Sequence, residues 1–250
     1  MYEYDLSVVI PCLNEEETVE TCINKCLEAF RMLGVNGEIV VSDNGSTDGT
    51  TKLSENLGAR VEVCMEKGYG SALRYGFKKA KGKYVIMGDG DNSYDFTLIP
   101  DFYDKIQEGY DMVIGTRLKG TIHKGAMPFL HRYLGNPVLT FILNLFFGTK
   151  ISDSQCGMRI FKKEKLESIV LSTTGMEFAS ELLVKAAWAE FSIAEIPIEF
   201  FKDGRSRKPY LKTWRDGWRH LKYLVLSKLS ELGLKFRYEN IQISYDKVKV

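Results

Sequence analysis

The chain has 250 residues, of which 34 are Lys or Arg and 33 are Asp or Glu. This balance excludes a global field that would attract nucleic acid, so any electrostatic function must come from local clusters. A chain of this length can bury a substantial core, and we expect a single domain over residues 1–230 with a charged tail at 231–250.

Cysteine usage and the amino terminus indicate a cytoplasmic chain. The cysteines are odd in number, form no CxxC pair and have no nearby histidine partner, which argues against a disulfide framework and a zinc site. They are Cys12, Cys22, Cys26, Cys64 and Cys156. The acidic amino terminus leads straight into a strand, so we expect no signal peptide. No run reaches the roughly 18 apolar residues of a spanning helix, which predicts a soluble or peripheral protein.

The first predicted strand ends in a polar loop. Residues 6–10 form a continuous apolar run typical of a buried parallel strand, and Pro11 stops it. Asn14 and Glu15 follow, ahead of a helix expected at 16–33. These two residues either cap that helix or face a ligand, and both roles stay open on this pattern alone.

The second strand, expected at 38–41, is followed by nine small or polar residues. A helix at 50–57 that is capped from within this segment would leave Asp43 free for a ligand at the strand end. A third strand at 60–64 and a helix at 71–81 come next. The intervening residues partly match the dinucleotide fingerprint GxGxxG, but Leu73 stands at the third glycine position, which disfavours a nicotinamide or flavin cofactor.

The central strand, at 84–87, carries the most informative motif. After Gly88 turns the backbone, Asp89 and Asp91 emerge at the carboxyl end of the strand, where open α/β sheets bind ligands. Two carboxylates so close repel each other unless a cation lies between them, and their hard oxygens suit Mg²⁺ or Mn²⁺. An ordinary turn is the plain alternative. An EF-hand is excluded because Tyr94 and Pro100 stand where its glycine and glutamate belong.

The remaining pattern predicts a doubly wound sheet whose later half is less regular. A helix at 96–108 and a strand at 112–115 complete a series of βαβ units. Further elements are expected as follows: a loop or broken helix at 120–137, an apolar helix at 137–147, a polar loop entering an edge strand at 151–161, a helix at 177–190, a strand at 193–201 broken by Pro197, and a short strand at 241–245.

A basic loop at 205–208 precedes an amphipathic helix near the carboxyl end. Trp214 and Trp218 mark one face of that helix, and Arg215 and Lys222 mark another. A basic helix with tryptophans at its boundary suits a membrane surface. Packing of the tryptophans against the sheet is an equal alternative at this stage.

The ordered set of loop motifs resembles the family 2 glycosyltransferases of GT-A fold. The motifs are Pro11-x-x-Asn14-Glu15, Asp43-Asn44-Gly45-Ser46-Thr47-Asp48-Gly49-Thr50 and Asp89-Gly90-Asp91. Three later motifs are similar to the branch of dolichyl-phosphate mannose and glucose synthases: Gly115-Thr116-Arg117, Asp153-Ser154-Gln155-Cys156-Gly157-Met158-Arg159 and Met176-Glu177-Phe178. The resemblance covers roughly residues 5–225.

This resemblance implies a Rossmann-like, mostly parallel sheet flanked by helices, with amphipathic helices at the carboxyl end, and it implies site residues. Asp91 would bind Mg²⁺ or Mn²⁺ with Ser93 or a water, and Asp89, Asp91 and Arg117 would be catalytic. The nucleotide sugar would contact Pro11, Leu13, Glu15, Ser42, Asp43, Asp89, Gly90, Arg205 and Lys208. The acceptor phosphate would contact Arg117, Arg132 and Asn136. Ser42, Asn44 and the order of residues in the basic loop depart from the usual motifs.

The implied function is inverting, metal-dependent transfer of a hexose or N-acetylhexosamine. The donor would be linked to UDP or GDP, with a weak preference for UDP by resemblance, and the acceptor would be a polyprenyl or dolichyl phosphate at the cytoplasmic face of a membrane. A membrane-protein partner could supply the anchor. The alternatives are a soluble glycosyltransferase with a saccharide acceptor, a sugar-1-phosphate nucleotidyltransferase, and a catalytically silent module that binds nucleotide sugars.

Overall fold

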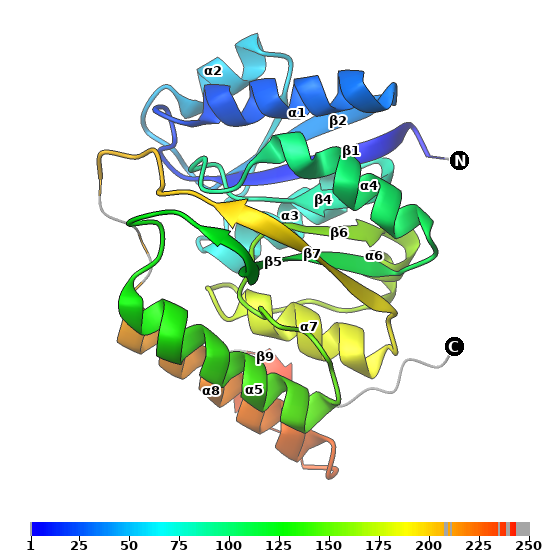
Figure 1. The fold of residues 1–250 in the computed structure, drawn as a ribbon, viewed down its shortest axis with the longest axis vertical. Coiled ribbons are helices and arrows are strands. Elements are labelled where there is room, and N and C mark those ends of the chain that lie inside the picture. The colour runs from blue at the N-terminus through cyan, green and yellow to red at the C-terminus, as the bar shows by residue number, and fades with distance from the viewer. Residues whose placement is uncertain (1, 208–209, 211, 235, 239–240, 244–250) are drawn as a thin grey trace.

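The computed structural model describes residues 2–207, 210, 212–234, 236–238 and 241–243. Within these residues, seven strands form one sheet in the order β3-β2-β1-β4-β6-β5-β7, with helices on both of its faces (Figure 1). The strands are β1 (Tyr4–Cys12), β2 (Gly37–Asp43), β3 (Arg60–Val63), β4 (Gly82–Met87), β5 (Met112–Ile122), β6 (Arg159–Lys162) and β7 (Ile193–Phe200). Neighbouring strands are parallel except where β6 pairs with β4 and β5. The expected mostly parallel α/β sheet is confirmed.

The central strands are buried on both faces, which explains their apolar sequences. Leu6, Val8 and Ile10 of β1 are fully buried, as a parallel strand covered by helices on both sides requires. The register pairs Cys12 with Asp43 at the ends of β1 and β2, and β4 runs parallel to β1 on its other side. The carboxyl ends of β1, β2 and β4 therefore meet at one edge of the sheet.

Helices enclose this sheet and form a further layer beyond it. They are α1 (Val19–Leu33), α2 (Thr50–Asn56), α3 (Tyr69–Lys79), α4 (Ile99–Gln107), α5 (Asn136–Phe147), α6 (Lys163–Ser168), α7 (Phe178–Trp188) and α8 (Thr213–Ser230). A 3₁₀ turn at Phe96–Leu98 precedes α4, and a π-helical turn at His131–Gly135 precedes α5. Helix α5 lies beside α8, and both contact α7 (Figure 1). Helix α8 is the amphipathic helix expected near the carboxyl end, and α5 is the apolar helix expected at 137–147.

The sequence predicted that the segment 151–161 enters a strand at the edge of the sheet, and this position is wrong. β6 lies inside the sheet, antiparallel to β4 and β5, and its residues Ile160 and Phe161 are fully buried. The connection from β5 through α5 brings the chain back in the reverse direction, so β6 fills the space between two parallel strands. Polar and apolar residues alternate in the segment that leads into β6, so the sequence does not reveal that the strand is buried.

The expected break at Pro197 is also wrong. β7 is continuous through Pro197, which pairs with Thr116 of β5. The strand order places β7 at the edge of the sheet. A proline costs little there, because an edge strand has no hydrogen-bonded neighbour on one of its sides. β5 itself runs to Ile122, beyond the expected end at 115, with a register shift against β7 between Thr116 and Thr121.

The carboxyl-terminal residues that are described pack onto α8. β8 (Phe236–Tyr238) and β9 (Ile241–Ile243) form an antiparallel pair, and the ring of Tyr238 meets that of Tyr223 edge-on at 5.8 Å. The short strand expected at 241–245 is confirmed for its first three residues, and the other two lie outside the described residues. The five cysteines are buried and unbridged, as expected. In the described part of the chain, each helix is too short or too polar to cross a membrane.

Candidate functional site

The loops after β1 and β2 are held together by side chains at the carboxyl edge of the sheet. The backbone N–H of Asn14 donates to Oγ of Ser46 at 2.8 Å, and Thr47 N–H donates to Oδ1 of Asn14 at 2.7 Å. Asp43 is buried, and its Oδ2 accepts N–H bonds from Gly45 at 3.0 Å and Ser46 at 3.1 Å. The expected ligand loops therefore form one rigid rim, shaped by their own short polar residues.

Two of the three departures from the usual motifs, Asn44 and Ser42, have structural roles. Asn44 donates from Nδ2 to the carbonyls of Cys64 and Glu66, and its Oδ1 accepts the N–H of Gly68. Ser42 is buried and donates from Oγ to the carbonyl of Ala72 at 2.6 Å. Both residues therefore attach the end of β2 to the start of α3, next to Asp43.

The glycine-rich start of α3 packs against protein backbone. The N–H groups of Gly70 and Ser71 donate to the carbonyl of Thr174, at 2.9 and 3.3 Å. A helix amino terminus that binds phosphate needs these first N–H groups for its ligand. Packing thus explains the partial match to the dinucleotide fingerprint, and the match gives no support for a nicotinamide or flavin cofactor.

Asp89 and Asp91 stand at the end of β4 with different partners. Oδ1 of Asp89 accepts the hydroxyl of Tyr69 at 2.8 Å. Oδ1 of Asp91 accepts both N–H and Oγ of Ser93, while its Oδ2 lies 2.9 Å from Nη2 of Arg205. Burial, followed by the nearby charge of Asp91, raises the pKa of Asp89 to about 7. A neighbouring negative charge and burial both disfavour the ionised form of a carboxyl group.

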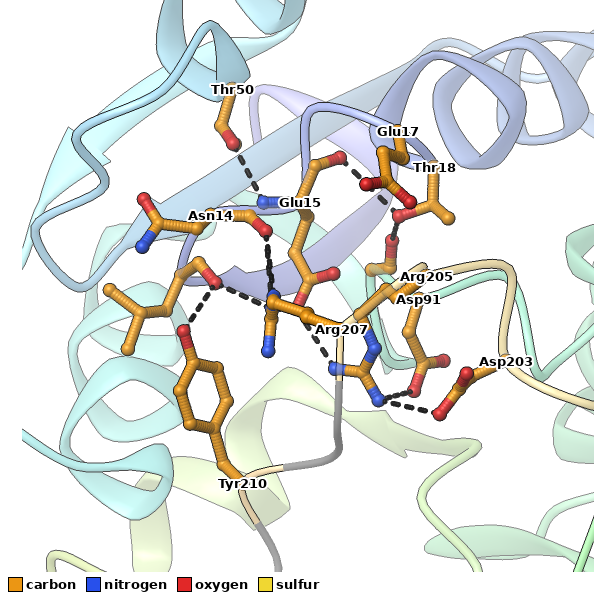
Figure 2. A network of polar contacts seen from close by, with 12 residues as sticks. Asn14, Glu15, Glu17, Thr18, Thr50, Asp91, Asp203, Arg205, Arg207 and Tyr210 are labelled. Atoms are coloured by element: carbon orange, nitrogen blue, oxygen red, sulfur yellow. Dashed lines mark hydrogen bonds and ion pairs between the residues drawn. The ribbon is translucent and has the colours of Figure 1, made fainter.

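The basic loop contacts Asp91 and Glu15 through Arg205 and Arg207, as Figure 2 shows. Nη1 of Arg205 lies 3.1 Å from Oε1 of Glu15, and Nη2 of Arg207 lies 2.8 Å from the same oxygen. Arg207 also donates to the carbonyl of Leu13 at 2.8 Å, and Ser206 N–H donates to Oε2 of Glu17 at 2.6 Å. The resemblance implied that Arg205 in this loop contacts the nucleotide sugar. Its other expected contact, Lys208, lies outside the described residues.

The buried part of this cluster contains polar atoms without partners. Oε2 of Glu15, Nε of Arg205 and Nη1 of Arg207 have no hydrogen-bond partner among the described residues. Burial raises the pKa of Glu15, although Arg205 and Arg207 oppose the shift. Such atoms are costly to leave unpaired, which indicates that the cluster is completed by a ligand.

The same cluster fits a divalent metal. Its carboxylate oxygens are the ligands that Mg²⁺ and Mn²⁺ prefer, and a guanidinium now supplies the positive charge beside Asp91. The described residues contain no group of three or more acidic, histidine or cysteine side chains arranged around one ion. Mg²⁺ commonly takes only one or two protein carboxylates, with phosphates and water completing its shell. Asp91 and Asp89 would meet that requirement, while Ser93 orients Asp91.

The expected acceptor residues come from three different elements. Arg117 of β5 is buried, and its Nε and Nη2 lie 2.7 and 2.8 Å from the two oxygens of Asp153. Arg132 lies in the π-helical turn against the ring of Tyr133, and Asn136 begins α5. Burial and then the charge of Arg117 lower the pKa of His131. Arg117 and the π-helical turn are therefore within electrostatic range of each other.

Other nucleotide-site expectations fall on this same edge. Pro11 pairs with Ser42 across β1 and β2. Gly90 lies against Cys12, whose Sγ would be 3.0 Å from an added Cβ, and the Gly90 carbonyl accepts the hydroxyl of Thr18 at 2.7 Å. These contacts hold the strand ends in place.

The sequence prediction missed three residues that the structure adds to the site. Arg207 and Glu17 bind the covering loop to the rim, and Tyr69 contacts Asp89. Arg207 and Glu17 could have been found from their charge alone, since each lies close in sequence to a predicted site position. Tyr69 had no such signal because it is separated from Asp89 by a helix and a strand.

An exposed apolar surface, here called the α5–α8 surface, lies on the two paired helices and the turn before them. Its large exposed side chains are Phe129, Tyr133, Leu134, Val138, Phe141, Leu145, Trp214, Trp218 and Val225. Trp214 is 79% exposed and Trp218 is 65% exposed. Packing of these tryptophans against the sheet, one of the two expectations, is therefore wrong.

An open, mostly parallel sheet with acidic and basic side chains at its carboxyl edge defines an α/β protein of the kind that binds ligands at that edge. Within that class, residues 7–170 match the family model described as glycosyl transferase family 2. The chain belongs to glycosyl transferase family 2, and the resemblance drawn from its motifs is confirmed.

Two relatives from Haloferax volcanii are among the most similar. The low-salt glycan biosynthesis hexosyltransferase Agl6 is 41% identical over 223 residues, which are 89% of this chain and 53% of that protein. A dolichyl-phosphate hexose transferase is 34% identical over 206 residues, which are 80% of this chain and 86% of that protein. This chain thus spans about half the length of the first relative and most of the second.

A solved structure confirms the expected GT-A fold. The glucosyl-3-phosphoglycerate synthase from Mycobacterium tuberculosis, in complex with Mn²⁺, UDP and glucosyl-3-phosphoglycerate, matches with a TM-score of 0.72. The match covers 97% of this chain and 87% of that chain at 20% sequence identity. At that identity, the likeness establishes the arrangement of the sheet and helices.

Proposed function

We propose that this chain transfers a hexose or N-acetylhexosamine from a UDP- or GDP-linked donor to a polyprenyl or dolichyl phosphate, with inversion and with Mg²⁺ or Mn²⁺. The observation that carries the proposal is the covered cluster at the sheet edge, where Glu15 and Asp91 share Arg205. Family membership and the similarity to a dolichyl-phosphate hexose transferase support it.

The donor would occupy the space beneath the covering loop. Asp91 and Asp89 would hold the metal, which supplies charge neutralisation for the departing diphosphate. Arg205 and Arg207 carry unpartnered N–H groups, and guanidinium forks suit phosphate oxygens. The carboxylate of Asp43 is fixed by its own turn and would accept a hydrogen bond from the nucleobase.

The acceptor would bring its own negative oxygen. A lipid phosphate is anionic at pH 7, so it can attack the anomeric carbon without a strong base, and positioning becomes the main task of the protein. Arg117, Arg132 and Asn136 are the proposed phosphate contacts. Asp153 holds Arg117 by a two-point ion pair, which fixes the direction of its guanidinium. One displacement step inverts the anomeric configuration.

The α5–α8 surface would bring the chain to the lipid. Exposed aromatic and aliphatic side chains beside Arg215 and Lys222 suit the interfacial region of a membrane. The same surface could instead meet a membrane-protein partner that supplies the anchor. In both cases the reaction would take place at the cytoplasmic face, where nucleotide sugars are available.

The experiment offers UDP-glucose, UDP-N-acetylglucosamine and GDP-mannose, each with Mn²⁺, to the chain with dolichyl phosphate in detergent. The expected product is a glycosylated lipid phosphate detected by mass spectrometry, and its formation should stop with chelator. Asp91→Asn should be inactive, and Asp101→Asn, on the exposed face of α4, is the matched control. Transfer to a saccharide with no transfer to lipid phosphate would favour a soluble glycosyltransferase instead. Donor binding without turnover would indicate a silent binding module.

A further inference from the structure

We propose that Tyr69 is a positioning residue whose phenol orients the Asp89 carboxylate toward the nucleotide sugar. Its hydroxyl donates to Oδ1 of Asp89 at 2.8 Å, across 20 positions of sequence. This inference rests on the proposed function, since it assigns a role within the same donor site. Tyr69 lies at the first turn of α3, and Asp89 lies just beyond the end of β4.

The backbone of Tyr69 is fixed by the residues on either side of it. Gly68 has φ +126, a conformation that favours glycine, and a Cβ at this position would collide with the carbonyl of Thr174. Gly68 N–H also donates to Oδ1 of Asn44 at 2.7 Å, and Gly70 N–H donates to Thr174 O at 2.9 Å. The backbone that carries the phenol is therefore held by Asn44 on one side and by Thr174 on the other.

The ring of Tyr69 is also restrained. It meets the ring of Phe178, at the start of α7, edge-on at a centroid distance of 6.5 Å. Edge-to-face contacts of this kind fix the plane of both rings. Packing of the Tyr69 ring therefore holds its hydroxyl at Asp89.

Asp89 is confined from its other side by Gly157. A Cβ added at Gly157 would be 2.9 Å from Oδ2 of Asp89 and 3.1 Å from Cε2 of Tyr94. The N–H of Gly157 donates to the hydroxyl of Tyr94 at 2.7 Å, which holds this backbone in place. The carboxylate therefore lies between a phenol that binds one oxygen and a backbone that limits the other.

Removal of the phenol hydroxyl would free this carboxylate to rotate. Nearby Asp91 repels it and Arg205 attracts it, so an unrestrained Asp89 would leave the direction that Tyr69 imposes. Loss of a hydrogen bond that orients a ligand or catalytic carboxylate commonly costs about 10- to 100-fold in activity or metal affinity. The loss should appear in kcat, because Tyr69 is placed to act on the donor and not on the lipid acceptor.

The test is a double-mutant cycle between Tyr69→Phe and Asp89→Asn. We expect Tyr69→Phe to lower kcat by about 10- to 100-fold, with the KM for dolichyl phosphate within twofold of wild type and a cooperative unfolding transition retained. In the Asp89→Asn background, Tyr69→Phe should lower kcat by less than about threefold, since the carboxylate that the phenol orients is already replaced by a neutral amide. Tyr103→Phe is the matched control, because Tyr103 pairs with Tyr84 away from this site.

Two outcomes would overturn the inference: Tyr69→Phe with kcat near wild type, or an equal loss in both backgrounds. Binding of UDP with Mn²⁺, measured by calorimetry, gives a second readout for the same cycle. There Tyr69→Phe should weaken binding at least fivefold, and the double variant should bind no more weakly than Asp89→Asn. If the wild type shows no transfer from any donor, the proposed function fails, whereas the calorimetric cycle still decides the role of Tyr69.

Discussion

Arg205 and Asp91 form an ion pair in which Nη2 lies 2.9 Å from Oδ2, although 114 residues separate them in sequence. The guanidinium therefore forms an ion pair with the carboxylate that is expected to bind the metal. A divalent cation on Asp91 would repel the Arg205 guanidinium because both are positively charged, so we expect metal binding to displace Arg205. Once released, its charge is available to the diphosphate that arrives with the metal.

Arg205→Gln should accordingly have opposite effects on metal binding and on turnover. Without the competing guanidinium, Mn²⁺ alone should bind about threefold more tightly, while kcat with a nucleotide sugar should fall at least about tenfold through loss of a phosphate contact. Calorimetry with MnCl₂ and steady-state assays measure the two effects. Arg31→Gln, at the exposed end of α1, is the control. Weaker Mn²⁺ binding in Arg205→Gln would contradict the exchange.

Asp91→Asn tests the metal assignment itself. The amide is a poorer ligand for a hard cation, and we expect turnover to fall by several orders of magnitude. The fold should persist, because Arg205 keeps Glu15 and Asp203 as partners. Turnover near the wild-type rate in the presence of chelator would rule out the metal.

The strand ends and their acids were predictable from sequence because buried parallel strands carry continuous apolar runs. The runs at β1 and β4 locate Glu15 and Asp91, since a polar residue after such a run must lie at the sheet edge. The position of β6 was not predictable, because its direction depends on how a long connection through α5 returns. The partners of Arg117 and Asp89 were hidden for a similar reason. They depend on packing between segments that are distant in sequence.

The buried pair of Arg117 and Asp153 should be important for stability as well as for the acceptor. Burial alone would raise the pKa of Asp153, but the Arg117 guanidinium lowers it below its usual range. Asp153→Asn would leave a buried charge without its partner, which costs about 3–5 kcal/mol of the free energy of unfolding. Denaturant unfolding measures this loss. Glu108→Gln, which breaks the exposed pair with Lys105, should cost less than about 1 kcal/mol. Similar losses for both variants would contradict the argument.

The α5–α8 surface should control membrane association. We expect the chain to sediment with vesicles of phosphatidylcholine and phosphatidylserine, and the double variant Trp214→Ser, Trp218→Ser to bind them at least about tenfold more weakly, because two large apolar side chains no longer enter the interface. Met65→Ser is the control, since Met65 is equally exposed but follows the edge strand β3. A wild-type chain that remains in solution would leave a protein partner as the anchor.

Helix α8 is joined to α7 by a histidine that should make stability depend on pH. His220 is buried, Nδ1 lies 2.8 Å from Oγ of Ser180, and burial lowers its pKa to about 4. Between that value and the ordinary value near 6.5, the unfolded chain binds a proton that the folded chain does not, so stability falls as pH falls. The full difference corresponds to about 3 kcal/mol.

This contribution must be measured by difference, because Asp89 acts in the opposite direction. Its raised pKa means that the folded chain binds the extra proton below about pH 7, so its contribution is lost as pH rises through that value. Unfolding free energies of wild type and His220→Asn at pH 7.5 and pH 4.5 separate the two groups. The variant should lose less stability than wild type on acidification, by about 2–3 kcal/mol. Equal losses would show that His220 does not determine the acid sensitivity of the α7–α8 contact.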